Sequence, residues 1–273
     1  MSLSRRLWLG VASAAAGTLA SAAAQSPDGG SPGGETLDKA IGRGVLSVGV
    51  SLGTPPFGSV GAGMEPEGYD VGVARLLARE LGVRAQIVDT VSADRIPSLL
   101  SGKVDLVISS FTVTSERARA IAFSNAVYVD QQVAVGPTMV AMGSVAEMRS
   151  QHIGVTRSTT NDSALSKQAP EGTLIQRYDD DAATNQALLS GQVQAIITSG
   201  AVAAAVRERS TGLALETKFV VSDAPMAVGL RHGEPELLHW VNTCLFMLWN
   251  SQELQSLQLR WMGTVNHELP RFG

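Results

Sequence analysis

The chain has 273 residues and a formal net charge of −4, with 44% apolar and 17% charged residues. This composition is typical of a globular protein and argues against disorder, and the lack of a basic run argues against nucleic acid as a partner. The single cysteine, Cys244, excludes an internal disulfide framework and a multi-cysteine metal site. The four histidines have no metal-ligand spacing, so neither a metal nor a cofactor is expected.

The first 24 residues have the features of an export signal: Arg5 and Arg6, a short apolar core and a small-residue ending. We expect cleavage near Ala24 after export by the general secretory or the twin-arginine route. Residues 25–35 are rich in Gly, Ser and Pro, which predicts a linker. No later segment reaches the ~18 apolar residues that span a bilayer, and no cysteine directly follows the expected cleavage site. The mature protein is therefore expected to be soluble, periplasmic and without a lipid anchor.

Strand-like and helix-like segments alternate from residue 45 onwards. In the first predicted helix, Asp70 is a suitable N-cap and Gly82 a suitable end. Alternation of this kind predicts βαβ units and a largely parallel sheet. The expected order is strand 45–50, helix 69–82, strand 84–89, helix 94–102, strand 103–110 and a charged, alanine-rich helix that ends near 124.

A repeat links the two halves of the chain. Residues 99–110, LLSGKVDLVISS, recur at 188–199 as LLSGQVQAIITS. Each copy is predicted to be a helix closed by glycine and followed by a strand with a hydroxyl at its end, which indicates two lobes of one α/β design. Because ligands bind at the carboxyl ends of strands in open α/β sheets, Ser110 and Ser199 are expected to face a shared cleft.

Hydroxyl side chains crowd the end of the first copy, in SSFTVTSER at residues 109–117. Two interpretations are open. The hydroxyls can cap a helix, as Ser and Thr commonly do. Together with Arg117 they can also bind an anion such as a carboxylate, which pairs bidentately with a guanidinium.

Eight short motifs identify a family. They are PPFG (55–58), GYD (68–70), IPSLLSGKVDLVISS (96–110), TSERARAIAFS (114–124), IGVTRSTT (153–160), LLSGQV (188–193), VGLRHGEPEL (228–237) and LRWMG (259–263). Each is weak alone, but together and in this order they are specific. Over about residues 36–265 the chain resembles the family 3 periplasmic solute-binding proteins, which deliver amino acids to ABC importers.

The resemblance implies an α/β fold of two lobes, the type II periplasmic binding protein fold, in which each lobe is a mixed sheet flanked by helices. Two crossover strands are expected near residues 130–137 and 222–230. Lobe 1 then comprises residues 36–131 and 224–273, and lobe 2 comprises residues 132–223. Such a protein is expected to be a monomer that closes around its ligand by a hinge motion.

The resemblance also implies ligand-binding residues in both lobes. It assigns the α-carboxylate of the ligand to Arg117, assisted by hydroxyl and backbone groups of Ser110 and Thr112. In the second lobe it places Thr156 and Thr159 against the ligand. Ordinary helix capping by Thr159 is the other interpretation and is compatible with binding.

The chain departs from its relatives at positions that shape the pocket. Thr54 and Ser92 stand where relatives often have an aromatic wall, so a more polar pocket is expected. Ser199 stands where relatives use an aspartate to bind the α-ammonium. In the acidic run 179–181, Asp181 is the candidate substitute, and a solvated charge run before a helix is the alternative.

Arg95 is a candidate partner for the side chain of the ligand. The segment SADRIP (92–97) resembles the glutamate/aspartate-binding branch of the family, in which the corresponding serine and arginine line the pocket, and this implies a modest preference for an acidic ligand. That branch has a further arginine where this chain has Ser51. The alternative is that Arg95 is an exposed residue in the first turn of its helix.

These observations lead to an expected function. The protein is an extracytoplasmic solute-binding protein that captures a small amino acid or related carboxylate between its lobes and delivers it to the membrane subunits of an ABC importer. It is not expected to be an enzyme. The alternative is a periplasmic enzyme on the same scaffold, similar to the cyclohexadienyl dehydratases, which needs a positioned acid in the cleft. Asp181 is the candidate for that acid.

Overall fold

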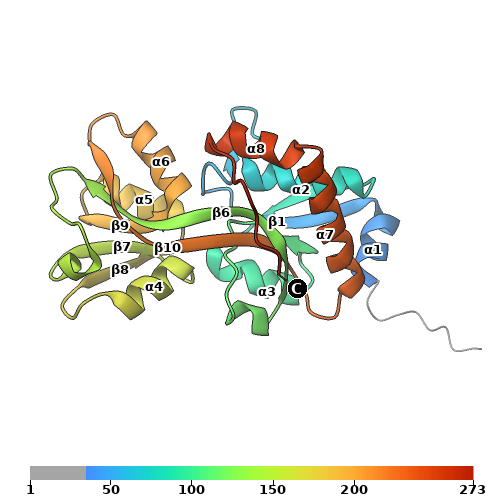
Figure 1. Cartoon of the computed structure of the whole chain (residues 1–273), viewed down its shortest axis with the longest axis horizontal. Helices are drawn as coiled ribbons and strands as arrows, with labels where there is room; N and C mark the ends of the chain where they lie inside the picture. The colour runs from blue at the N-terminus through green and yellow to red at the C-terminus, as the bar shows by residue number, and fades with distance from the viewer. Residues whose placement is uncertain (1–34, 273) are drawn as a thin grey trace, which may run out of the picture. The chain divides into compact units, whose positions relative to one another are not determined.

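The structure, a computed structural model, describes residues 35–272 (Figure 1). The expected export signal lies outside these residues, as does the expected linker except for Glu35, at which helix α1 (Glu35–Arg43) begins. The described residues belong to one compact unit. Among residues 35–272, no helix has the length and apolar character needed to cross a bilayer.

The first half of the chain has the strand and helix alternation that the sequence predicts. Helix α2 buries the face that carries Val73 and Leu77 against the sheet. The elements are β1 (Val45–Val50), β2 (Ser59–Val60), β3 (Pro66–Glu67), α2 (Tyr69–Glu80), β4 (Arg84–Asp89), the 3-10 turn η1 (Ser92–Asp94), α3 (Arg95–Leu100), β5 (Leu106–Val107) and the 3-10 turn η2 (Arg117–Arg119).

The second half contains a further set of alternating strands and helices, followed by two helices at the C-terminal end. Its elements are β6 (Ala122–Pro137), the 3-10 turn η3 (Val145–Met148), β7 (His152–Thr156), α4 (Thr160–Gln168), β8 (Leu174–Tyr178), α5 (Asp181–Leu189), β9 (Ala195–Ser199), α6 (Gly200–Arg209), β10 (Leu215–Leu230), α7 (Pro235–Asn250) and α8 (Glu253–Met262).

Eight strands form one mixed sheet in the order β4-β1-β5-β10-β6-β9-β7-β8. Strand β1 pairs in parallel with β4 and β5, and β7 pairs in parallel with β8 and β9. The long strands β6 and β10 pair antiparallel between these two groups and run from one lobe into the other (Figure 1). This arrangement confirms the predicted α/β fold, with two lobes of sheet and flanking helices joined by two crossover strands.

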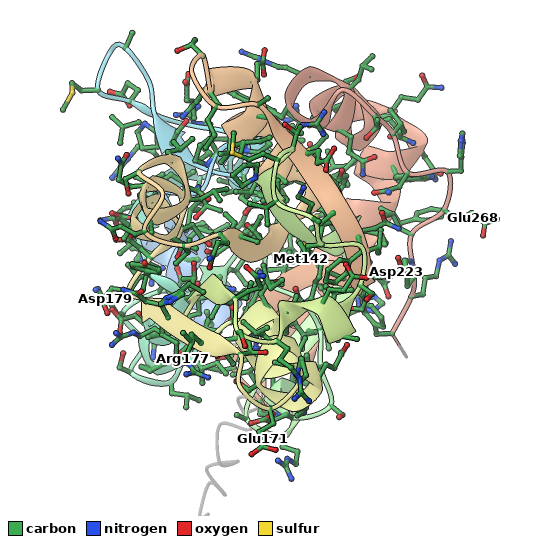
Figure 2. The ribbon with its side chains drawn as sticks, turned by 90° about the vertical axis from the view of Figure 1, so that its left-hand side faces the viewer. Met142, Glu171, Arg177, Asp179, Asp223 and Glu268 are labelled. Carbon is green, nitrogen blue, oxygen red and sulfur yellow. The ribbon has the colours of Figure 1, made fainter. Side chains whose placement is uncertain are left out.

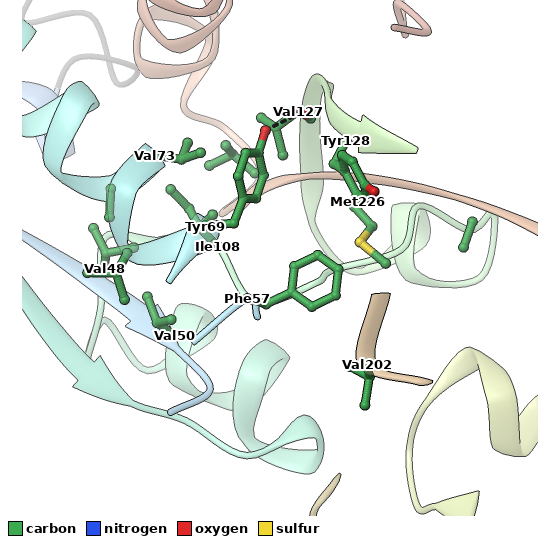
Figure 3. Close-up of a cluster of buried hydrophobic side chains, with 14 of the residues drawn as sticks. Val48, Val50, Phe57, Tyr69, Val73, Ile108, Val127, Tyr128, Val202 and Met226 are labelled. Atoms are coloured by element: carbon green, nitrogen blue, oxygen red, sulfur yellow. Dashed lines mark hydrogen bonds between the residues drawn. The ribbon is translucent and has the colours of Figure 1, made fainter. Parts of the chain in front are cut away.

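The C-terminal helices contact elements from the beginning of the chain. Both α7 and α8 contact α2, and α7 also contacts α1 and β6. The core beneath them contains an aromatic group in which the rings of Phe57 and Tyr69 each contact that of Tyr128 (Figure 3). The Tyr69 hydroxyl donates a hydrogen bond to the carbonyl oxygen of Val127 at 2.5 Å. The start of α2 is thereby fixed against β6, because the buried hydroxyl has a partner and the rings exclude water.

The structure corrects the expected helix at the end of the hydroxyl-rich stretch. Residues Arg117–Arg119 form a single 3-10 turn, and β6 begins at Ala122. Strand β6 pairs with β10 over most of its length and with β9 near its end, and this pairing overrides the helix propensity of alanine and arginine. The strand expected at 103–110 is also shorter, since only Leu106–Val107 pairs as β5.

The expected N-cap of α2 is also wrong. Gly68 occupies the N-cap position, and no side chain caps this helix. Asp70 lies in the first turn, where its Oδ2 accepts a hydrogen bond from the backbone N–H of Ser110 at 2.6 Å. The carboxylate therefore holds a loop at the end of the neighbouring strand instead of its own helix.

Candidate ligand-binding site

A polar pocket of about 30 Å³ lies where segments of the two lobes meet. Ser110 and Ser199, the equivalent residues of the repeat, both line it. Three predicted site residues, Ser92, Thr156 and Arg117, do not line it, but each forms a hydrogen bond with a residue that does. The predicted site residues that line the pocket are Thr54, Arg95, Ser110, Thr112, Thr159, Asp181 and Ser199.

Sequence reasoning missed several residues of the pocket. Thr160 and Asn161 directly follow Thr159, so the TRSTTN segment contained the signal for them. Gln132 lies on β6, and its Nε2 donates to Thr160 Oγ1 at 2.6 Å. Asn161 Oδ1 is buried without a hydrogen-bond partner. The remaining lining residues are Thr198, Val202, Ala224 and Met226, which carry no polar pattern that the sequence alone could distinguish from core.

Arg95, at the start of α3, is buried, with 4% of its surface exposed. This excludes the alternative of an exposed residue in the first turn. One terminal nitrogen, Nη2, donates to Ser92 Oγ, while Nε is buried without a partner. Burial lowers the pKa of Arg95, and the carboxylates of Asp181 and Asp70 oppose this effect. The pocket thus contains a buried cation with an unused donor.

The acidic run before α5 divides into three roles. Asp179 (Figure 2) is the solvated member, because 80% of its side chain is exposed and it pairs with Arg157. Asp180 caps α5 by accepting the backbone N–H of Ala183 at 2.7 Å. Asp181 lines the pocket. The alternative of a solvated charge run therefore describes Asp179 but not Asp181.

Asp181 is held by hydroxyls from both lobes. Its Oδ1 accepts a hydrogen bond from Thr156 Oγ1 at 2.8 Å, and its Oδ2 accepts one from Thr54 Oγ1 at 2.9 Å. Thr156 also bonds to Thr184 Oγ1 at 2.8 Å. Thr156 thus contacts the pocket residue Asp181 without lining the pocket itself, and Thr54 bonds to the same carboxylate from the other lobe.

Two guanidinium groups lie over one aromatic ring at the edge of the pocket. The Arg117 guanidinium is 4.9 Å from the centre of the Phe111 ring, and that of Arg95 is 5.4 Å from it. Arg117 Nη1 donates to Thr112 O at 2.7 Å, and its Nη2 donates to Ser158 O at 3.3 Å. Burial, and to a lesser degree the charge of Arg95, lowers the pKa of Arg117 to about 9. The two cations are close enough to repel each other, which an anion between them relieves.

The hydroxyls on the second side of the pocket also serve as helix caps. Thr159 Oγ1 accepts the backbone N–H of Asp162 at 3.1 Å and donates to Thr156 O at 2.7 Å, which caps α4. Ser199 Oγ accepts the backbone N–H of Val202 at 3.2 Å, which caps α6. The capping interpretation of Thr159 is confirmed, and the residue also lines the pocket, so ligand binding by Thr159 stays a prediction.

The cysteine, histidine and acidic side chains of the described residues form no metal cluster. Within residues 35–272, no group of three or more His, Cys, Asp or Glu side chains could hold a metal ion. Cys244 lies buried in α7, where burial raises the pKa of its thiol to about 11. The thiol is therefore protonated at neutral pH and serves as an unreactive part of the core.

Two lobes of α/β structure joined by a pair of antiparallel strands, with a polar pocket between them, define the two-lobed class of solute-binding proteins. The model of the bacterial extracellular solute-binding proteins, family 3, matches residues 46–264. The chain therefore belongs to this family, as its motifs predicted.

Relatives and solved structures agree with this assignment. The L-cystine-binding protein TcyJ of Escherichia coli K12 is 28% identical over 229 residues, which cover 83% of this chain and 86% of that protein. ABC transporter arginine-binding protein 1 of the same strain is 25% identical over 79% of this chain and 90% of that protein. The crystal structure of a mutant of ArgBP from T. maritima has a TM-score of 0.78 and 30% identity, covering 84% of this chain and all of that one.

A further neighbour concerns the alternative function. The crystal structure of the ancestral amino acid-binding protein AncCDT-1, described as a precursor of cyclohexadienyl dehydratase, has a TM-score of 0.78 and 28% identity. It covers 83% of this chain and 99% of that chain. The expected closeness to the glutamate/aspartate branch receives no specific support, since the relatives named here bind cystine or arginine.

Proposed function

We propose that this protein captures a small amino acid, or a related carboxylate, in the pocket between its lobes and delivers it to the membrane subunits of an ABC importer in the periplasm. It acts as a monomer and carries out no catalysis. The observation that supports this most is the pairing, within one pocket, of a buried cation with a carboxylate on the facing lobe, Arg95 and Asp181. A zwitterion needs both signs of charge.

The α-carboxylate of the ligand is assigned to Arg117, Ser110 and Thr112. One terminal nitrogen of Arg117 donates a hydrogen bond to Thr112 O, and the contact of the other with Ser158 O is longer, at 3.3 Å. A ligand carboxylate replaces that weaker contact with a charge-assisted one. The α-ammonium is assigned to Asp181, because Ser199 is engaged as a helix cap and has no charge.

Ligand entry requires the lobes to separate. The 30 Å³ of the pocket holds roughly one or two water molecules. Three contacts cross the pocket: Thr54 to Asp181, Thr160 to Thr112, and Arg117 to Ser158. Opening about the crossover strands breaks these contacts and admits the ligand.

The unused Nε of Arg95 supports a modest preference for a ligand with an acidic side chain. A side-chain carboxylate accepts from this nitrogen and is paired with a buried cation. The nearby carboxylates of Asp70 and Asp181 limit the gain, because they already share the charge of Arg95.

The test is identification of the bound molecule. Mass spectrometry of the small molecules released on denaturing the purified protein should detect an amino acid, and calorimetry with the twenty amino acids should give a dissociation constant in the micromolar range or below for it. A released ligand without a carboxylate, or no binding of any amino acid or related carboxylate, would contradict the proposal.

The dehydratase alternative rests on the pocket carboxylate Asp181 and on the likeness to AncCDT-1. We expect no turnover of prephenate or arogenate by the purified protein, because Asp181 is held by two threonine hydroxyls and no second acid lines the pocket. Loss of either compound at an enzymatic rate, abolished by Asp181→Asn, would establish the enzyme instead.

A further inference from the structure

A buried carboxylate outside the pocket connects the segments that form one side of it. Asp70 is 3% exposed and does not line the pocket. Its backbone N–H donates to Phe57 O at 2.9 Å, in the turn that follows the pocket residue Thr54. Its Oδ2 accepts the backbone N–H of Ser110 at 2.6 Å. One residue thus ties two pocket loops to the start of α2.

The hydrogen bond to Ser110 has a conformational role. Ser110 has a φ of 40°, in the left-handed region that non-glycine residues seldom adopt. Such a conformation persists only where surrounding interactions hold it. The Asp70 carboxylate supplies a short bond to the N–H of this residue. Asp70 therefore contributes to the position of the Ser110 hydroxyl in the pocket.

Asp70 also acts on the buried cation. Its charge and that of Asp181 both favour the ionised form of Arg95, against the effect of burial. Arg95 lines the pocket, whereas Asp70 stands outside it. The net charge of the cluster formed by Arg95, Asp181 and Asp70, which a ligand meets at Arg95, therefore depends on whether Asp70 is ionised.

We propose that Asp70 is a positioning and specificity-determining residue of the ligand pocket: it holds Ser110 in place and sets the charge that Arg95 offers to the side chain of the ligand. This inference rests on the proposed function, since it concerns the same pocket. With Asp70 ionised, two carboxylates balance Arg95 and an acidic side chain is disfavoured. With Asp70 protonated, one carboxylate remains, and an acidic side chain is bound more tightly.

The two states of Asp70 exchange near neutral pH. Burial raises the pKa of Asp70 to about 7, although the Ser110 N–H and Arg95 both lower it. The other ionisable group that faces it is its neighbour Tyr69, whose pKa burial raises strongly, while Asp181 faces Arg95. Guanidinium groups keep their charge between pH 6 and pH 8, and Arg117, with a pKa lowered to about 9, is still mostly protonated at pH 8. Asp70 is thus the group in this cluster whose charge changes over that range.

The experiment measures selectivity between two probes of equal size, L-glutamate and L-glutamine, by calorimetry at pH 6 and pH 8. For the wild-type protein we expect the glutamate-to-glutamine affinity ratio to be roughly tenfold higher at pH 6, as a change of one nearby charge predicts. Asp70→Asn keeps an oxygen acceptor for Ser110 N–H and removes the titration. In that variant the ratio should not change with pH and should resemble the wild-type value at pH 6.

Asp105→Asn is the matched control. Asp105 is also a buried carboxylate of the first half of the chain, accepts the backbone N–H of Ser47 at 2.7 Å and does not line the pocket. Its substitution should leave the wild-type pH profile of the ratio intact. All four histidines remain in both variants, so any contribution from them persists equally.

The outcomes separate this inference from the proposed function. If the probes bind and the glutamate-to-glutamine affinity ratio has the same pH profile in wild type and Asp70→Asn, the role of Asp70 is overturned. The proposed function then stays in place. If neither probe binds, the selectivity role is overturned, while the proposed function depends on the wider ligand screen. Carbon-detected NMR of the Asp70 carboxyl follows the same titration in the wild-type protein, even if the variant does not fold. A midpoint below pH 5 overturns the inference.

Discussion

Arg95 shows how far a single pocket residue could be predicted. It is buried, bonded to Ser92 and part of the pocket lining, as the SADRIP segment implied, while its role towards the side chain of the ligand stays a prediction. Asp181 could also be predicted, because it lies in an acidic run before a helix. The role of Asp70 could not be predicted. A carboxylate at the start of a helix usually bonds to that helix, whereas the partner of Asp70 lies 40 residues further along the chain.

Replacing Arg95 with alanine should lower both stability and selectivity. The substitution leaves the buried Asp70 and the pocket carboxylate Asp181 without their shared cation, so we expect a loss of about 3–5 kcal/mol in unfolding free energy at pH 8. Glutamate should bind more weakly, while glutamine is largely spared. Urea unfolding and calorimetry measure the two effects, with Arg95→Lys as the control that keeps the charge. An equal loss of affinity for both ligands would exclude a side-chain role.

Arg117→Ala should weaken every amino-acid ligand. Removing a desolvated partner of a charge pair costs about 2–5 kcal/mol, or roughly 30-fold to several thousand-fold in affinity. Arg117→Lys should give an intermediate loss, since an ammonium keeps the charge but not the two parallel hydrogen bonds. Calorimetry with the identified ligand measures both. Wild-type affinity in Arg117→Ala would reject the carboxylate assignment.

The pKa of Asp70 makes stability depend on pH. The folded protein holds the Asp70 proton up to about pH 7, whereas an unfolded aspartate releases it near pH 3.9. The stabilising contribution of the protonated form is therefore complete below about pH 4 and lost as pH rises towards 7. Relative to Asp70→Asn, the wild-type protein should lose roughly 1–4 kcal/mol between pH 4.5 and pH 8 in urea unfolding. A difference that does not vary with pH would contradict the raised pKa.

Among the elements, the segment from residue 104 to residue 124 differs most from expectation. Its alanines and arginines favour a helix locally, but β6 begins at Ala122 and continues to Pro137. What the local pattern could not show is that β10, nearly a hundred residues later, pairs with it. By contrast α2, α3 and β1 depend on local apolar patterns, and the sequence predicted them close to their observed bounds.

Variants of Thr159, the N-cap of α4, should distinguish helix capping from ligand binding. Thr159→Ala removes an N-cap bond to Asp162 N–H and should cost about 1 kcal/mol in unfolding free energy, while Thr159→Ser should keep both the cap and the pocket hydroxyl. If Thr159 also contacts the ligand, the alanine variant loses affinity beyond what serine loses. Thermal unfolding and calorimetry measure the two properties independently. Lower stability with unchanged affinity would leave capping as its sole role.

The two-lobed organisation of the whole molecule could be predicted because the sequence contains an internal repeat, with one copy in each half. The repeat at 99–110 and 188–199 placed Ser110 and Ser199 at equivalent strand ends, and both line the pocket. The boundaries of the lobes remain predictions, because β6 and β10 belong to one continuous sheet with no break between lobes. The three contacts that cross the pocket could not be predicted, since each joins side chains or backbone groups from distant segments.

Because residues of both lobes line the pocket, a ligand should stabilise the whole molecule. At a ligand concentration of 100 times the dissociation constant, binding adds about 2.7 kcal/mol to the unfolding free energy. For a chain of this size that corresponds to a rise of roughly 5–10 °C in melting temperature. Differential scanning calorimetry should show one transition that moves as a unit, and Arg117→Ala at the same ligand concentration should show less than half the rise. Two transitions of which only one moves would place the ligand within a single lobe and contradict a site between them.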